Sequence, residues 1–504
     1  MALDEGAPMI SRLKDRPISR RTTMFVVAFA AMCVTASTAF GAPLTPAESA
    51  QVDQIVAAAL AQAGTPSASV AVVRDGQIAF AKAYGLRRIE THEAATADTR
   101  YRAASVSKQF TAAAVLMLAD QGKFSLDDPL SRYLPELGAA NHATIRQALS
   151  HTAGFPEFWT VDYVTPEKRT VTTPQAIVDR WGAEPPDFQP GSKFHYSNTN
   201  YVILGRLVEK VSGKPLDAFL QEHIFRPLSM TSAEDVDGKL VGTGDAEGYS
   251  RRALGPPRPA QRAAAGWTVG CGELSMTASD LARWDMAMLD RRLMSPRAYD
   301  AQQTAGKLTD GSVTGYGLGV FVDETGGHRR IRHNGDLAGY WSENRVYPDD
   351  KAAIVVMING NYGGSPHEVI ANGLEQMLLP PKAVAAGPAQ PPSLDATVRV
   401  IFRQIMGGQL DRSLLSPDAS DYLSGGVLED YHRSFQELGP PLAFTSLQSD
   451  TDDGLQSQSW QAIWATATLK FTLRVRPDGK VEEFYVFPGV DRRLPPPELP
   501  ATKP

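Results

Sequence analysis

The stretch Arg102-Ala103-Ala104-Ser105-Val106-Ser107-Lys108-Gln109-Phe110 stands immediately before an apolar, alanine-rich run, and it decides how the chain is interpreted. A helix that begins here places Ser105 and Lys108 on one face, about one turn apart. A serine hydroxyl attacks poorly unless a neighbour takes its proton, and a lysine whose charge is disfavoured serves as that base. The stretch therefore predicts a nucleophile and its base, although a Ser-x-x-Lys pair alone also arises by chance in many chains.

A second element is the tripeptide Tyr196-Ser197-Asn198, which lies between a Pro-Gly turn and an apolar helix expected over residues 202–211. A phenol is normally protonated at pH 7, but neighbouring cations favour its anion, and Tyr196 can then relay a proton. Asn198 can hold Lys108 and a substrate amide. Taken alone, the tripeptide is better explained as a turn tyrosine followed by a helix-capping asparagine.

The third element is His333-Asn334-Gly335-Asp336, at the end of a strand expected to begin at His328. His333 can supply a cationic or hydrogen-bonding side chain. The backbone N–H of Asp336, paired with that of Ser105, can form an oxyanion hole. Gly335 permits close approach of a substrate to the strand. Taken alone, a structural histidine is the commoner explanation.

The order of the three motifs resembles the serine β-lactamase and penicillin-binding-protein superfamily, whose signature is Ser-x-x-Lys. The likeness is strongest to its class C-like branch, which includes D-amino-acid-specific peptidases and family VIII esterases. It covers roughly residues 45 to 380. Further matching segments are residues 122–129, 149–154, 196–205 and 272–281.

The resemblance makes Ser105 the acylated nucleophile, gives Lys108 and Tyr196 the general-base work, and lets Asn198 position the substrate. His333 stands where β-lactamases of this branch usually have the lysine of Lys-Thr-Gly. Histidine is only partly charged near pH 7 and grips a carboxylate less firmly than lysine does. This departure weighs against efficient β-lactam hydrolysis and leaves an esterase or a peptidase equally open.

The implied fold is α+β: an antiparallel sheet flanked by helices, with an all-helical region carrying Tyr196 and the serine at their junction. We expect a signal peptide over 1–41, the β-lactamase-like serine hydrolase domain over 42–379 and a Pro-rich linker over 380–392. A small α+β accessory domain over 393–490 and a Pro-rich tail over 491–504 follow. In the accessory domain we expect helices at 394–406 and 427–438 and strands at 457–466, 468–476 and 481–487, with its aromatic residues forming a core.

The N-terminus predicts export, because a basic segment ending at Arg21 precedes an apolar run over 24–34 and then small residues. We therefore expect a periplasmic or secreted mature protein without a stable membrane anchor. Cys33 falls in the signal, so Cys271 is left alone and no internal disulfide is expected. Flanked by two glycines, Cys271 is interpreted as a packed residue and not a catalytic one.

The leading prediction is an exported serine hydrolase, needing neither metal nor cofactor, that forms an acyl-enzyme on an ester, amide or β-lactam carbonyl of a small-molecule or peptide substrate. The net charge of -6 gives no reason to expect nucleic acid as a partner. The Gly-x-Ser-x-Gly elbow of another hydrolase fold does not occur in the sequence. The alternatives are a penicillin-recognising sensor, whose acyl form persists, and a catalytically silent scaffold.

Overall fold

The computed structural model describes residues 43–488, apart from 139–141, 161–163, 252–255, 381, 383–393, 424, 442, 453–454 and 465–467. The predicted signal peptide and the Pro-rich tail lie outside the described residues. The predicted linker also lies outside them, except for Pro380 and Lys382. Among the described residues, no helix is both long and apolar enough to cross a membrane.

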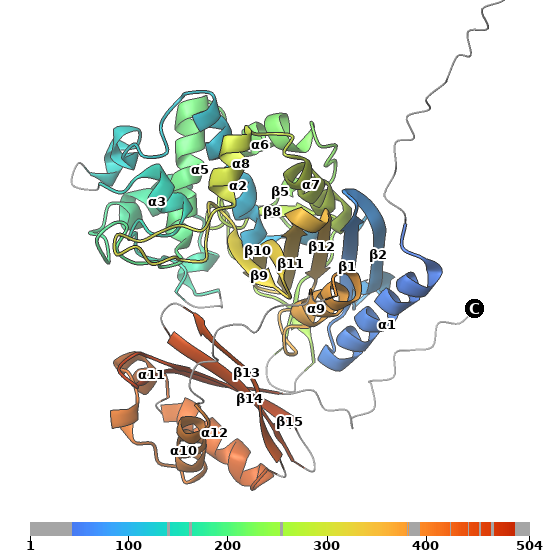
Figure 1. Cartoon of the computed structure of the whole chain (residues 1–504), viewed down its shortest axis with the longest axis vertical. Coiled ribbons are helices and arrows are strands. Elements are labelled where there is room, and N and C mark those ends of the chain that lie inside the picture. Colours follow the sequence, from blue (N-terminus) through green and yellow to red (C-terminus); the bar gives the residue numbers. More distant parts are fainter. Residues whose placement is uncertain are drawn as a thin grey trace, which may run out of the picture. The chain divides into compact units, whose positions relative to one another are not determined.

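A seven-stranded antiparallel sheet is the centre of the part over residues 43–382 (Figure 1). Its order, β3-β2-β1-β12-β11-β10-β9, joins the N-terminal strands to the late ones through the β1–β12 pair. The sheet therefore confirms the predicted antiparallel arrangement. The strands are β1 (Ser67–Arg74), β2 (Gln77–Arg88), β3 (Glu93–Ala94), β9 (Phe321–Thr325), β10 (His328–Leu337), β11 (Tyr340–Tyr347) and β12 (Ala352–Ile358).

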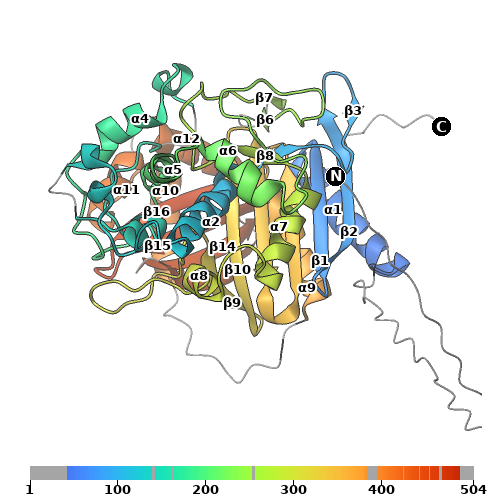
Figure 2. The same cartoon turned by 90° about the horizontal axis from the view of Figure 1, so that it is seen from above.

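Alternate residues of β1 and β12 point to opposite faces of this sheet, as the two-residue period of a strand requires. Val70 and Val356 pack into a core beneath α1 (Pro46–Ala63) and α9 (Pro366–Leu378). Ala71 and Val355 pack into the larger core on the other face, which α7 (Ala278–Asp290) covers (Figure 2). The near-continuous apolar sequences of the two strands follow from burial on both faces.

Helix α2 (Ser107–Asp120) lies between this sheet and the helical region, and twelve of its fourteen residues are buried. A helix buried on every side is apolar all round, which accounts for its alanine-rich sequence. It packs on α5 (Asn198–Ser212). The other helices of this part are α3 (Ile145–Leu149), α4 (Pro174–Ile177), α6 (Leu216–Leu220) and α8 (Pro296–Gln302).

Two boundaries in this part are set by local contacts. Strand β9 begins at Phe321, because Gly319 has a φ of +84° and the N–H of Gly317 closes a turn on the carbonyl of Val320. Helix α7 is capped by Thr277, whose side chain accepts the N–H of Asp280.

The part over residues 394–488 contains a second antiparallel sheet, in the order β13-β14-β15-β16, together with three helices (Figure 1). Trp460, Phe471 and Phe484 are fully buried in its own core. They are core residues, as predicted, and β13 is a strand that the sequence did not suggest. The elements are α10 (Asp395–Met406), α11 (Pro417–Tyr422), α12 (Gly425–Leu438), β13 (Ala443–Asp452), β14 (Leu455–Ile463), β15 (Thr468–Val475) and β16 (Val481–Pro488).

Candidate active site

Ser105 lies in a short 3-10 turn, Ala104–Val106, between strand β4 (Tyr101–Arg102) and α2. The serine is partly exposed, whereas the residues on both sides of it are buried. The N–H of Ala103 donates to the carbonyl of Leu274 at 2.8 Å, which ties the turn to strand β8 (Leu274–Met276). Ala104 has a φ of +50°, a strained conformation for a residue with a side chain and one typical of functional sites. The predicted helix thus starts after the serine.

Lys108 is fully buried and reaches three acceptors with its ammonium group. Its Nζ lies 3.0 Å from Ser105 Oγ, 2.7 Å from Asn198 Oδ1 and 2.8 Å from the carbonyl oxygen of Cys271. These three partners match the three donors of an ammonium group and fix its position. The distance to Ser105 is short enough for direct proton transfer.

Tyr196 lies beside the lysine, with its ring centroid 5.0 Å from Lys108 Nζ. One face of the ring packs on His151 at 4.2 Å between centroids, and the ring of His333 is 6.2 Å away. The structure therefore brings together the serine, the lysine, the tyrosine and His333, as the order of the motifs suggested.

Asn198 begins helix α5 and carries two contacts with its side chain. Its Oδ1 accepts from Lys108, and its Nδ2 donates to Glu157 Oε1 at 3.2 Å. The backbone N–H of Asn198 donates to Glu157 Oε2, so the carboxylate lies at the positive end of the helix. Burial raises the pKa of Glu157 above its usual range, while the N–H groups of Asn198 and Trp159 oppose that rise.

Glu157 was not among the residues predicted from the sequence. The signal available was an acidic residue placed among Phe155, Phe158 and Trp159, directly after the His-Thr-Ala-Gly segment. A carboxylate in such an apolar run needs a partner, and here the partner is the start of α5.

His151 is a second residue that was missed. It has a φ of +57° and is fully buried, and its Nδ1 accepts the N–H of Ser197 at 3.1 Å. Burial, with a smaller contribution from the charge of Lys108, holds the pKa of His151 well below 6.5. The ring of Tyr196 therefore packs on a neutral imidazole.

His333 lies inside strand β10 and not at its end, because the strand continues to Leu337. Only 1% of the side chain is exposed. Burial and the charge of Lys108 lower the pKa of His333 to about 3. The expectation of partial charge near pH 7 is therefore wrong: this histidine is neutral. In the neutral form, its Nδ1 donates to the carbonyl of Asn334 at 2.6 Å and its Nε2 accepts from the hydroxyl of Tyr316 at 3.0 Å.

That Gly335 admits a substrate stays a prediction, and the structure shows a close approach to protein at this glycine. A Cβ at this position would lie 2.3 Å from the carbonyl oxygen of Ala103 and 2.4 Å from Ser342 Oγ. The close approach is thus made by the turn that carries the nucleophile. The side chain of Asp336, the next residue, is exposed.

The thiol of Cys271 is buried, and burial raises its pKa to about 12. The backbone carbonyl of this residue contributes to the site, because it accepts a hydrogen bond from Lys108. Within the described ranges, no group of three or more His, Cys, Asp or Glu side chains is arranged to hold a metal ion.

A sheet flanked by helices, with Ser-x-x-Lys beneath a tyrosine and an asparagine, defines the class of serine β-lactamases and penicillin-binding proteins. The profile of the family Beta-lactamase matches residues 52–376. The chain belongs to this family.

Among curated proteins, a D-aminopeptidase of Brucella anthropi is 28% identical over 304 residues, which are 60% of this chain and 57% of that protein. Protein flp of Staphylococcus aureus is 26% identical over 333 residues, 63% of this chain and 64% of that protein. The chain thus spans less than two thirds of the length of either relative.

Among solved structures, a D-stereospecific amidohydrolase from Streptomyces sp. has a TM-score of 0.56 and 26% identity, covering 66% of this chain and 99% of its own. The octameric penicillin-binding protein homologue of Pyrococcus abyssi has a TM-score of 0.59 at 20% identity, covering 88% and 97% of the two chains. At that identity, the second likeness shows the fold alone.

Proposed function

We propose that the protein is an exported serine hydrolase that forms an acyl-enzyme on Ser105 and hydrolyses an ester, amide or β-lactam carbonyl. The observation that carries the proposal is the contact of 3.0 Å between Lys108 Nζ and Ser105 Oγ, with the lysine held by Asn198 and the carbonyl of Cys271. A buried lysine fixed against a serine suits proton transfer better than it suits a surface role.

In acylation, Ser105 Oγ attacks the carbonyl carbon while its one proton passes to Lys108 in the neutral, unprotonated form, which returns it to Tyr196 when Tyr196 protonates the leaving group. The N–H groups of Ser105 and Asp336 stabilise the oxyanion. The tetrahedral intermediate collapses as Tyr196 protonates the leaving group, and the acyl chain remains on Ser105. In deacylation, water attacks the ester with the same groups acting as base, and the acid product leaves.

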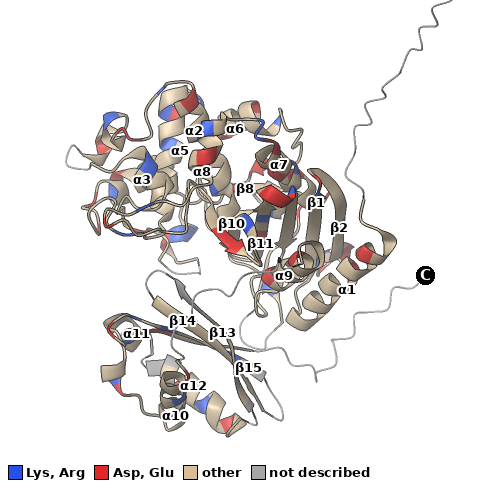
Figure 3. Cartoon of the chain, in the orientation of Figure 1, with Lys and Arg blue, Asp and Glu red and all other residues tan. Residues whose placement is uncertain are grey.

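Within this class, amides with a free amino group on the acyl side are favoured over β-lactams. The neutral His333 supplies no fixed cation for a carboxylate at the place of the usual lysine. The Glu157 carboxylate accepts from the Asn198 side chain at 3.2 Å, so a negative charge lies directly behind the residue expected to position the substrate. Relatives named D-aminopeptidase and D-stereospecific amidohydrolase support the same choice. Acidic and basic residues are interspersed over the described elements (Figure 3).

The test is labelling with a fluorophosphonate and with penicillin, read by mass spectrometry, followed by a panel of nitrocefin, p-nitrophenyl butyrate and D-alanine peptides. We expect an adduct on Ser105 that is strongly diminished in Lys108→Ala, together with turnover of the esters or the D-peptides. An adduct that persists without turnover would instead indicate the sensor. Absence of any adduct would indicate the silent scaffold. N-terminal sequencing of the protein recovered from the periplasm or medium tests export.

A further inference from the structure

Arg102 and Arg262 line a shallow, open recess beside strand β10. Arg102 ends the strand that leads into the Ser105 turn. The opposite wall is made by the two residues that follow Asp336. The lining includes Arg102, Val164, Asp237, Arg262, Leu337 and Ala338.

Among the described residues, no carboxylate forms an ion pair with Arg102 or Arg262, although Asp237 lines the same recess. Arg102 donates to the carbonyl of Lys239 at 3.1 Å, and Arg262 Nη1 is buried with no hydrogen-bond partner. Asp237 also lines the recess, but its Oδ1 accepts from the backbone N–H and hydroxyl of Thr268. Its Oδ2 accepts from the N–H of Gly266. Both oxygens of Asp237 are therefore occupied by donors of the segment 266–268, while its negative charge remains in the lining.

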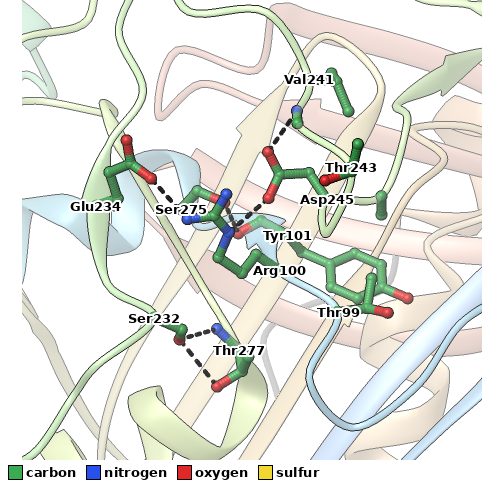
Figure 4. Close-up of polar contacts among 12 residues, drawn as sticks. Thr99, Arg100, Tyr101, Ser232, Glu234, Val241, Thr243, Asp245, Ser275 and Thr277 are labelled. Carbon is green, nitrogen blue, oxygen red and sulfur yellow. Dashed lines mark hydrogen bonds and ion pairs between the residues drawn. The ribbon is translucent and has the colours of Figure 1, made fainter.

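Arg100, two residues before Arg102, shows the opposite arrangement. Its guanidinium lies between Glu234 and Asp245, at 2.6 Å from each carboxylate, and both contacts are drawn in Figure 4. The described residues thus give that arginine two acidic partners, and give neither arginine of the recess an ion pair. A buried guanidinium donor without a partner is costly, and a carboxylate is the ligand that matches its planar donors.

The position of the recess along β10 indicates which part of a substrate would enter it. Tyr196, the proposed proton donor to the leaving group, lies near His333. At about 3.3 Å per residue, Leu337 is about 13 Å further along the strand. Gly335, packed against the serine turn, lies between these two ends. A substrate whose leaving group departs near Tyr196 therefore directs its acyl portion toward the recess.

We propose that this recess is an anion subsite in which Arg102 and Arg262 bind a carboxylate carried on the acyl portion of the substrate. The inference rests on the proposed acyl transfer at Ser105, and it adds a selection for acidic acyl groups.

The test compares two esters of equal chain length, 4-nitrophenyl hydrogen adipate and 4-nitrophenyl hexanoate, which differ in a terminal carboxylate. We expect the wild-type protein to prefer the adipate ester by about tenfold or more in kcat/KM, the size of one or two charge-assisted hydrogen bonds. Arg262→Gln and Arg102→Gln lower that preference while kcat/KM for the hexanoate ester is retained. Arg132→Gln removes the same charge at an exposed arginine outside the recess and leaves the preference unchanged.

Calorimetry with adipate itself, on the wild type and on Arg262→Gln, tests the anion subsite separately from hydrolysis at Ser105. Binding that is lost in the variant supports the subsite even where neither ester is turned over, in which case the proposed hydrolysis fails and the subsite stands. Turnover of both esters at a ratio that neither arginine variant alters, with no adipate binding, overturns the subsite and leaves the hydrolase intact.

Discussion

The substitution Gly335→Ala tests whether strand β10 fixes the position of the nucleophile. The added methyl group would lie 2.3 Å from the Ala103 carbonyl oxygen and 2.4 Å from Ser342 Oγ, about 1 Å short of ordinary contact at 3.4 Å. Ser342 cannot simply rotate away, because its hydroxyl donates to that same carbonyl at 2.7 Å. The strand and the turn must therefore separate by on the order of 1 Å, and Ser105 moves with the turn.

Two magnitudes follow from this displacement. Overpacking of this kind typically costs about 1–3 kcal/mol of unfolding free energy, so the variant still folds. A displacement of about 1 Å between reacting groups can reduce the rate about a hundredfold. We therefore expect the second-order rate of fluorophosphonate labelling of Ser105 to fall by about that factor, with only a modest drop in Tm.

The matched control is Gly244→Ala, since a Cβ at Gly244 meets nothing within 4 Å. It should label at the wild-type rate. The reasoning is refuted if Gly335→Ala labels as fast as this control. It is also refuted if the loss of labelling merely parallels the loss of folded protein in the melting curve.

Three further predictions concern buried titratable groups. Burial lowers the pKa of His367 to about 3. Below pH 6.5 the unfolded chain therefore binds a proton that the native state does not bind, and the free energy of unfolding decreases as the pH is lowered. In His367→Phe, urea unfolding at pH 5 and pH 7.5 should show an acid loss smaller by about 2 kcal/mol than in the wild type; equal losses would contradict this. Burial raises the pKa of Glu273 to about 8, so between pH 4.5 and 8 the native state keeps a proton that the unfolded chain loses, and stability falls as pH rises. Glu273→Gln should lessen that loss of unfolding free energy, measured by urea unfolding between pH 5 and 8. An unchanged dependence of the unfolding free energy on pH would show that the native carboxyl does not keep its proton in this range. Cys271→Ser should retain full hydrolytic activity, because the thiol is protonated and only the backbone carbonyl touches Lys108, whereas a loss comparable to that of Ser105→Ala would make the thiol catalytic.

The pairing of Ser105 with Lys108 was predictable because it is local. They are three positions apart in the sequence, and any helical or 3-10 turn brings two such side chains together. The convergence of Tyr196 and His333 on this pair is not local, and only the order of the motifs within a recognisable family suggested it.

The residues that escaped prediction are those whose role depends on burial. The neutrality of His333 is set by its desolvation and by Lys108, which lies far from it in sequence. The placement of Glu157 depends on where the start of α5 lies in space. Strand β13 was missed for a related reason: it is an edge strand, paired on one side only, and its largely polar sequence gives no clear alternation.

The histidine at position 333, where β-lactamases of this branch usually have a lysine, affects more than one contact. A lysine there would place a second cation near Lys108, in a region where burial already keeps the imidazole neutral. With histidine, Lys108 lies beside the rings of Tyr196 and Tyr201. The guanidinium groups of Arg102 and Arg262 lie in the recess beside the far part of β10. Recognition of an anionic group is thereby moved away from the leaving-group end of the strand and toward the acyl end. A chain arranged in this way selects its substrate by what is attached to the acyl carbon, which is the property that the two esters and the arginine variants measure.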